Sequence, residues 1–142
     1  MKATVSWKHK LAFDGKTDSG HTIPLDASAD AGGENSGSRP LELIAMGLAG
    51  CTGMDVISIL HKKRQDVATF EVKVSAERAE NHPRVFTRIL LEFIVTGRHI
   101  ELDAVQRAVE LSATKYCSVQ AMLMKAVSIE QKITIIEVED IS

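Results

Sequence analysis

The sequence predicts an α+β domain. Segments of alternating apolar and polar residues near both ends predict strands. An almost unbroken apolar stretch from Leu41 to Leu60 predicts a long helix, and a segment around residues 102–116 has helical spacing. A length of 142 residues suits one domain, and no internal repeat or linker divides it, so residues 1–142 are expected to fold together.

Two strands are predicted near the N-terminus. Apolar and polar residues alternate through residues 3–8 and again through residues 21–26. Pro24 cannot donate a hydrogen bond to a sheet, so the second strand should lie at an edge or end there. Residues 26–38 are small, polar and glycine-rich. They lack the glycine–lysine spacing of a phosphate-binding loop, so they are interpreted as a flexible connection.

A long helix is predicted from about Pro40 to Arg64. Pro40 suits a first helical turn, and Glu42 lies where the helix dipole is positive, whereas the basic residues 62–64 lie at the negative end. Apolar side chains occupy nearly every face of this helix. We therefore expect burial on most faces, under a sheet, other helices or a second subunit.

The rest of the chain predicts an antiparallel hairpin with one buried face, two helices and a last strand. These elements are expected at residues 70–77 and 89–95, 102–116, 119–125, and 127–138.

Composition excludes several classes of protein. Lys and Arg total 17 against 19 Asp and Glu, a net charge of −2, which argues against general nucleic-acid binding. Glu42 and Asp55 interrupt the apolar stretch, so no membrane span is expected. The first ten residues lack the apolar core of a signal peptide, so a cytoplasmic location is expected. In that compartment a disulfide would be catalytic or redox-sensing, not a structural staple.

The chain has two cysteines, Cys51 and Cys117. They form no C-x-x-C motif, no histidine stands at zinc-finger spacing from them, and no H-E-x-x-H occurs. Neither a metal nor a cofactor is therefore expected.

Cys51 lies inside the predicted long helix among glycines at positions 47, 50 and 53. Each glycine costs about 1 kcal/mol in a helix interior, which indicates a close approach of other groups. Asp55 and Ser58 follow at i+4 and i+7 and share the face of the cysteine. Free cysteines are often buried as small hydrophobic residues, but this polar stripe favours a functional site.

Cys117 immediately precedes the short third helix, with Ser118 as a candidate N-cap. The N-terminus of a helix stabilises a thiolate, which suits a reactive sulfur. An inert cysteine at a helix boundary fits the same pattern.

These features together resemble a known family. Residues 40–43 read P-L-E-L, residues 49–53 read A-G-C-T-G and residues 116–119 read Y-C-S-V. With this order of elements, they resemble the OsmC/Ohr family over essentially the whole chain, and in detail its YhfA-like branch. The resemblance implies an intertwined homodimer in which antiparallel sheets wrap around a long buried central helix, with sites at the subunit interface.

The resemblance also implies a function in the oxidative stress response. Cys51 would be the peroxidatic and Cys117 the resolving cysteine of a thiol-dependent peroxidase that reduces organic hydroperoxides with a dithiol or lipoyl-type reductant. Family peroxidases use an arginine from the N-terminal strands and a glutamate directly after the proline. Residues 1–38 contain no arginine and Leu41 follows the proline. The candidate cations for the thiolate are therefore Arg39 and a lysine or histidine of the N-terminal strands, such as Lys16 or His21. Arg39 is favoured because a guanidinium stays charged when partly buried.

Asp55 is placed in the same candidate catalytic set, although a carboxylate beside Cys51 disfavours its thiolate. The alternative function is a non-catalytic homodimer of the same fold that senses redox state or binds a small ligand. A purely structural homodimer with two inert thiols is a third interpretation.

Overall fold

The computed structural model describes residues 1–139. The chain divides into two compact units, one up to Ala45 and one from Met46 onward, and each is described by itself. Helix α1 (Pro40–Lys62) crosses the division. The mixed α+β class is confirmed, since both sheets and helices are present. The expectation that residues 1–142 form one domain stays a prediction.

The first unit contains a three-stranded antiparallel sheet in the order β1-β2-β3. Its strands are β1 (Ala3–His9), β2 (Ala12–Thr17) and β3 (Thr22–Leu25). The edge position expected from Pro24 is correct, because β2 is the one strand among residues 1–139 that pairs with β3, which otherwise makes an isolated bridge from Leu25 to Ser38. Strand β2 was not predicted, because its sequence A-F-D-G-K-T contains Asp and Gly, which have low strand propensity. Pairing with a strand on each side compensates for that low propensity.

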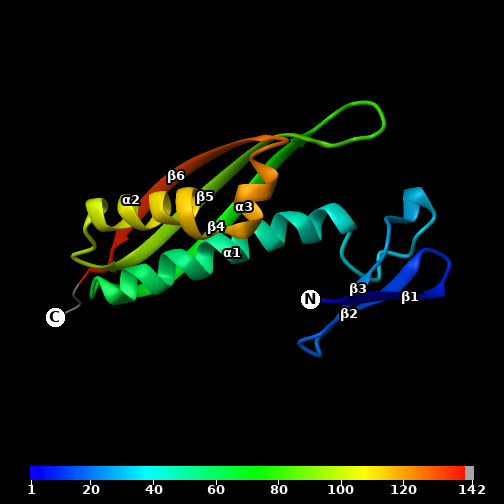
Figure 1. Ribbon diagram of the computed structural model, residues 1–142, viewed down its shortest axis with the longest axis horizontal. Coiled ribbons are helices and arrows are strands. Elements are labelled where there is room, and N and C mark those ends of the chain that lie inside the picture. The colour runs from blue at the N-terminus through cyan, green and yellow to red at the C-terminus, as the bar shows by residue number, and fades with distance from the viewer. Residues whose placement is uncertain (140–142) are drawn as a thin grey trace. The chain divides into compact units, whose positions relative to one another are not determined.

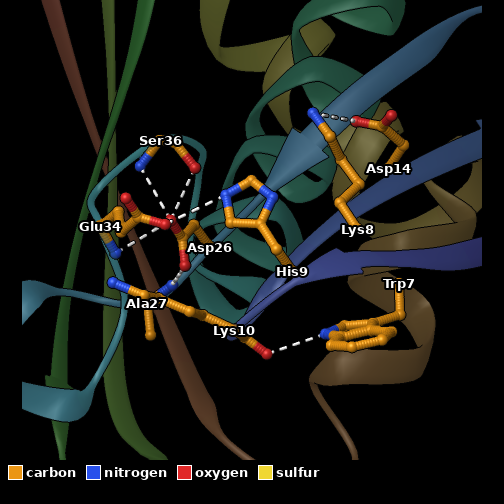
Figure 2. Close-up of polar contacts among 9 residues, drawn as sticks. All are labelled: Trp7, Lys8, His9, Lys10, Asp14, Asp26, Ala27, Glu34 and Ser36. Carbon is orange, nitrogen blue, oxygen red and sulfur yellow. Dashed lines mark hydrogen bonds and ion pairs between the residues drawn. The ribbon is translucent and has the colours of Figure 1, made fainter.

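The loop at residues 26–38 is hydrogen-bonded to the buried carboxylate of Asp26 (Figure 2). Asp26 accepts hydrogen bonds from the backbone N–H groups of Ala27 (2.7 Å), Glu34 (3.1 Å) and Ser36 (3.0 Å) and from the Ser36 hydroxyl (2.6 Å). The bonds from Ser36 are the largest cause of an Asp26 pKa well below the usual range. The interpretation of this loop as a flexible connection was therefore wrong.

Gly33 shows how closely this loop is packed. A Cβ atom at that position would lie 2.2 Å from the carbonyl oxygen of Ala27, which no side chain tolerates. Figure 2 also shows His9 reaching Glu34 with 3.0 Å between Nε2 and the carboxylate, so β1 is joined to the same loop. Gly33 thus allows close packing around the Asp26 carboxylate.

The second unit contains the sheet β4-β5-β6, the part of α1 from Met46 onward and three further helical elements (Figure 1). The elements are β4 (Asp66–Arg78), β5 (Phe86–Arg98), α2 (Leu102–Leu111), the π-helical turn η2 (Ser112–Tyr116), α3 (Ser118–Leu123) and β6 (Ser128–Glu137). Strands β4 and β5 form the expected antiparallel hairpin.

Strand β6 runs parallel to β5, from Arg88 opposite Ser128 to Gly97 opposite Glu137. The expectation of purely antiparallel sheets is therefore wrong for this pair. The reason is the connection: α2, η2 and α3 return the chain to the start of β5, which is how parallel neighbours are joined. An apolar strand sequence does not reveal the direction of its partner.

The core of the second unit lies between one face of the sheet and the helices. Alternate residues of β5 are fully buried, as the alternation predicts. The core side chains come from β5 (Ile89, Leu91, Phe93, Val95), from α2 (Ala104, Val105, Ala108, Val109) and from α1 (Leu48, Val56, Leu60), joined by Cys117.

Only one stripe of α1 is buried in the single chain. Leu48, Thr52, Val56 and Leu60 follow each other at intervals of four residues and are fully buried. Met54, by contrast, is 73% exposed. In the single chain the sheet covers one side of this helix, and the expectation that a second subunit helps to bury its other faces stays a prediction.

Helix α1 also has the length and composition of a membrane span, with a mean hydropathy of 1.8 over its most apolar window. The core helix of a soluble protein passes the same test. In this structure 22% of that window is buried, and the buried stripe belongs to a core that α1 shares with the sheet.

Candidate functional site

Cys51, Asp55 and Cys117 meet in one cluster. The two Sγ atoms and a carboxylate oxygen of Asp55 all lie within 4.8 Å of one another. Cys51 and Asp55 are one turn apart on α1, and Cys117 follows η2 at the start of α3. Cysteines 66 positions apart in sequence are thus brought together, and both are free thiols.

The two thiols differ in accessibility. Cys51 is half-buried, whereas Cys117 is only 2% exposed. Cys117 has an extended backbone and is itself the N-cap of α3: its Sγ accepts the backbone N–H of Gln120 at 3.3 Å. The expectation that Ser118 caps this helix was therefore wrong, since Ser118 is already the first helical residue.

Burial raises the pKa of the Cys117 thiol to about 11. The neighbouring Cys51 thiol and the negative charge of Asp55 act in the same direction, while the N–H of Gln120 opposes them. Cys117 is therefore a protonated thiol near neutral pH.

A buried hydroxyl network holds the carboxylate of the cluster. The Ser112 hydroxyl donates to Asp55 Oδ2 at 2.8 Å and lies 2.9 Å from the hydroxyl of Thr52. Ser112 and Thr52 are both fully buried. Since one hydroxyl has one proton, Thr52 supplies the proton of the second contact whenever Asp55 is ionised.

Sequence reasoning did not select Ser112 or Thr52 as site residues. Ser112 stands on the apolar face of the second predicted helix, where a single serine is unremarkable. Thr52 and Ser112 each stand as a single polar residue on an otherwise apolar helix face. Because buried polar groups need partners, these two positions were the indication that their side chains meet.

The glycines around Cys51 do not all mark close contacts. A Cβ at position 53 would lie 3.3 Å from Val72 of β4, so Gly53 lets the sheet approach the helix. At Gly47 and Gly50 no described atom lies within 4 Å of such a Cβ. The expectation of close approach therefore holds for Gly53 alone in the described chain.

Arg39 belongs to the first unit, where its side chain is bound locally. Its guanidinium donates to the side chain of Asn35 (2.6 Å) and to the carbonyl of Gly37 (3.1 Å). Its backbone N–H donates to Glu42 at 2.8 Å, which satisfies a free donor at the start of α1. Any action of Arg39 on a thiolate would require its guanidinium to exchange these partners.

A groove of about 370 Å³ adjoins the cluster. Asp55 contributes to its wall, together with Ser58, Lys62, Lys63 and Tyr116. The wall of the groove therefore carries the carboxylate that lies beside the two thiols, together with two lysines.

The cluster could offer three donors to a cation, but tight binding of zinc would require both thiols to ionise. Redox chemistry between two sulfurs makes no such demand.

Comparison with known proteins identifies the family. A family model described as OsmC-like protein matches residues 33–132. The chain belongs to the OsmC-like family. It is 51% identical to Protein YhfA of Escherichia coli K12 over 132 residues, which cover 91% of this chain and 93% of that protein. The resemblance to the OsmC/Ohr family and its YhfA-like branch is thus confirmed.

Solved structures agree with this assignment. A hypothetical protein from Aquifex aeolicus is 30% identical, with a TM-score of 0.85 and coverage of 97% of both chains. The organic hydroperoxide resistance protein OhrB of Bacillus subtilis is 20% identical, with a TM-score of 0.61 and coverage of 94% of this chain and 98% of that one. This last similarity shows a shared fold.

Proposed function

We propose that this OsmC-like protein is a thiol-dependent peroxidase that reduces organic hydroperoxides through Cys51 and Cys117. The observation that supports it most directly is the meeting of two free thiols within 4.8 Å beside a groove, with one thiol accessible and the other buried. The fold shared with organic hydroperoxide resistance proteins favours the same class of substrate.

In the proposed first step the Cys51 thiolate attacks the outer oxygen of the hydroperoxide. The O–O bond breaks, Cys51 becomes a sulfenic acid, and the alkoxide leaves as an alcohol after taking up the proton that the Cys51 thiol lost on ionising. Cys51 takes this role because it is half-buried, whereas Cys117 is almost inaccessible and holds its proton.

In the second step the sulfur of Cys117 attacks the sulfenic sulfur. A disulfide forms, and the hydroxyl group leaves as water. A sulfur separation of up to 4.8 Å must close to about 2.05 Å, a movement within reach of side-chain rotation and a small helix shift. A dithiol or lipoyl-type reductant then returns both thiols by exchange.

The proposed working form is a cytoplasmic homodimer. Met46 and Met54 are exposed apolar side chains of α1, a surface of the kind that a second copy would cover. Open space beside Gly47 and Gly50 would allow the helix of a second copy to approach. Arg39 is proposed as the cation that activates Cys51, within the chain or from the second copy.

Peroxide turnover tests this proposal. Cumene hydroperoxide is added with dithiothreitol, and its consumption is followed for wild type and for Cys51→Ser and Cys117→Ser. We expect catalytic turnover in wild type alone and a disulfide in the non-reduced protein by mass spectrometry. Undiminished turnover by Cys51→Ser would remove the proposal.

The groove beside Asp55 favours a second candidate, a dimer that senses redox state or binds a small ligand. Such a protein would form the disulfide once per chain without sustained turnover. Consumption of one equivalent of peroxide, with no further loss when dithiothreitol is present, would favour this alternative.

A further inference from the structure

Asp55 lies beside both thiols, in a position that thiolate activation does not explain. A carboxylate beside a thiol disfavours loss of the thiol proton, so it cannot be the group that activates either cysteine by charge. Yet its oxygen lies within 4.8 Å of both sulfurs, and a buried serine holds it there. A group that accepts and returns a proton between these atoms fits that position.

We propose that Asp55 is the proton carrier of disulfide formation and that Ser112 is its positioning residue. This inference rests on the two-cysteine function proposed above. As the sulfur of Cys117 bonds to the sulfur of Cys51, Asp55 takes the proton of the Cys117 thiol. It then delivers that proton to the group that leaves Cys51, which for a sulfenic acid is hydroxyl, released as water.

The need for such a carrier follows from the state of Cys117. This thiol is only 2% exposed, with its sulfur at the N-cap of α3, so little of it is in contact with solvent that could take its proton. The acidity of a thiol rises steeply as its sulfur forms a new bond, so a carboxylate becomes a competent base during the step itself. Transfer concerted with S–S bond formation therefore avoids a free Cys117 thiolate.

The hydroxyl network determines how Asp55 is held. The Ser112 hydroxyl donates to Asp55 Oδ2. The hydroxyl of Thr52, which lies about one turn before Asp55 on α1, contacts the Ser112 hydroxyl. Ser112 is also the residue whose carbonyl accepts the N–H of Cys117 at 2.8 Å. Ser112 thus orients both the carboxylate of Asp55 and the backbone of Cys117, the attacking cysteine. π-Helical turns such as η2 are frequent at functional sites.

Ellman's reagent, an aromatic disulfide, separates this step from peroxide chemistry. Cys51 attacks the reagent, releases one thionitrobenzoate and keeps the other as a mixed disulfide. Cys117 then attacks that mixed disulfide, its proton is taken up, and the second thionitrobenzoate leaves. The measured quantity is the ratio of the second rate to the first, and Cys117→Ser serves as the reference that releases only one equivalent.

We expect Asp55→Asn to lower this ratio by about 100-fold, the usual worth of a positioned base. Loss of the negative charge alone would favour the Cys117 thiolate and raise the ratio, so the sign of the change separates the two effects. An unchanged or raised ratio in Asp55→Asn, or no second release in wild type, overturns the role of Asp55. Added formate is expected to restore the ratio in Asp55→Ala, a recovery that a purely structural defect would not show.

Ser112→Ala should lower the ratio less than Asp55→Asn, and Ser112→Thr, which keeps the hydroxyl, should recover it. Thr114→Ala is the matched control, because Thr114 lies in the same turn but donates to the carbonyl of Glu110. Equal ratios in Ser112→Ala and Thr114→Ala would remove Ser112 from the mechanism.

Peroxide turnover is assayed on the same proteins. If wild type consumes no peroxide while Asp55→Asn lowers the ratio, the peroxidase proposal fails and the proton-carrier role stands. If wild type consumes peroxide and Asp55→Asn does not lower the ratio, the peroxidase proposal stands and the proton-carrier role fails.

Discussion

The sulfur of Cys117 accepts the backbone N–H of Gln120 at 3.3 Å and so caps the helix that follows it. The proposed resolving cysteine therefore also has a structural role. A small polar acceptor is needed at this position even if the chemistry is removed.

Substitutions of Cys117 should separate its two roles. Cys117→Ser keeps an acceptor for Gln120, so its stability should stay close to that of wild type. Cys117→Ala loses the cap and should cost about 1 kcal/mol in the free energy of unfolding. Urea unfolding followed by circular dichroism measures both. Equal stability of the two variants would show that the cap contributes nothing.

Alkylation should distinguish the thiols. A shift of the Cys117 pKa from 9.0 to about 11 lowers its thiolate fraction at neutral pH roughly a hundredfold. Iodoacetamide at pH 7.5 should therefore label Cys51 first, with Cys117 following only as the pH approaches 11. Peptide mass spectrometry locates the label, and protein unfolded in urea is the control in which the difference disappears. Faster labelling of Cys117 in the folded protein would contradict the burial argument.

Asp26 should make stability depend on pH. Its folded pKa lies below the ordinary value of 3.8, so its contribution is fully present above that value and is lost as pH falls below it. Asp26→Asn should therefore melt at a lower temperature than wild type at pH 7, with a smaller difference near pH 3. Asp30→Asn, an exposed change in the same loop, is the control. A melting-temperature difference that does not shrink on acidification would count against this account.

A charge on the exposed face of α1 should disrupt assembly. Light scattering of wild type at micromolar concentration is expected to give twice the chain mass of 15.5 kDa. Met54→Asp places a carboxylate on the apolar face that a second copy would cover, so its mass should fall toward that of one chain. Val85→Asp, at an exposed apolar position in the connection between β4 and β5, is the matched control. A wild-type mass of 15.5 kDa would contradict the dimer proposal.

Arg39→Ala tests the activating cation. If the guanidinium stabilises the Cys51 thiolate, the variant should be alkylated at Cys51 several-fold more slowly near neutral pH, with the difference vanishing at high pH. Arg84→Ala, in the connection between β4 and β5, is the control for loss of a surface charge. Superimposable profiles for wild type and Arg39→Ala would leave Arg39 with only its bonds to Asn35 and Gly37.

Local patterns in the sequence determined several elements directly. The alternation in residues 89–95 placed the buried face of β5, and the apolar stretch placed α1 within two residues of its observed end. The motifs around Cys51 and Cys117 indicated the family. These features depend on neighbours within one or two turns of a helix or along one strand, so the sequence alone reveals them.

The tertiary structure decided what depends on residues far apart in the chain. The parallel pairing of β6 with β5 follows from the path of the connection, and the burial of only one stripe of α1 follows from what the sheet can cover. The bond between Ser112 and Asp55 joins positions 57 residues apart, as the bonds of Asp26 join residues across its loop. A polar side chain finds such a partner only after the apolar core has packed, because burial then makes an unpaired polar group costly.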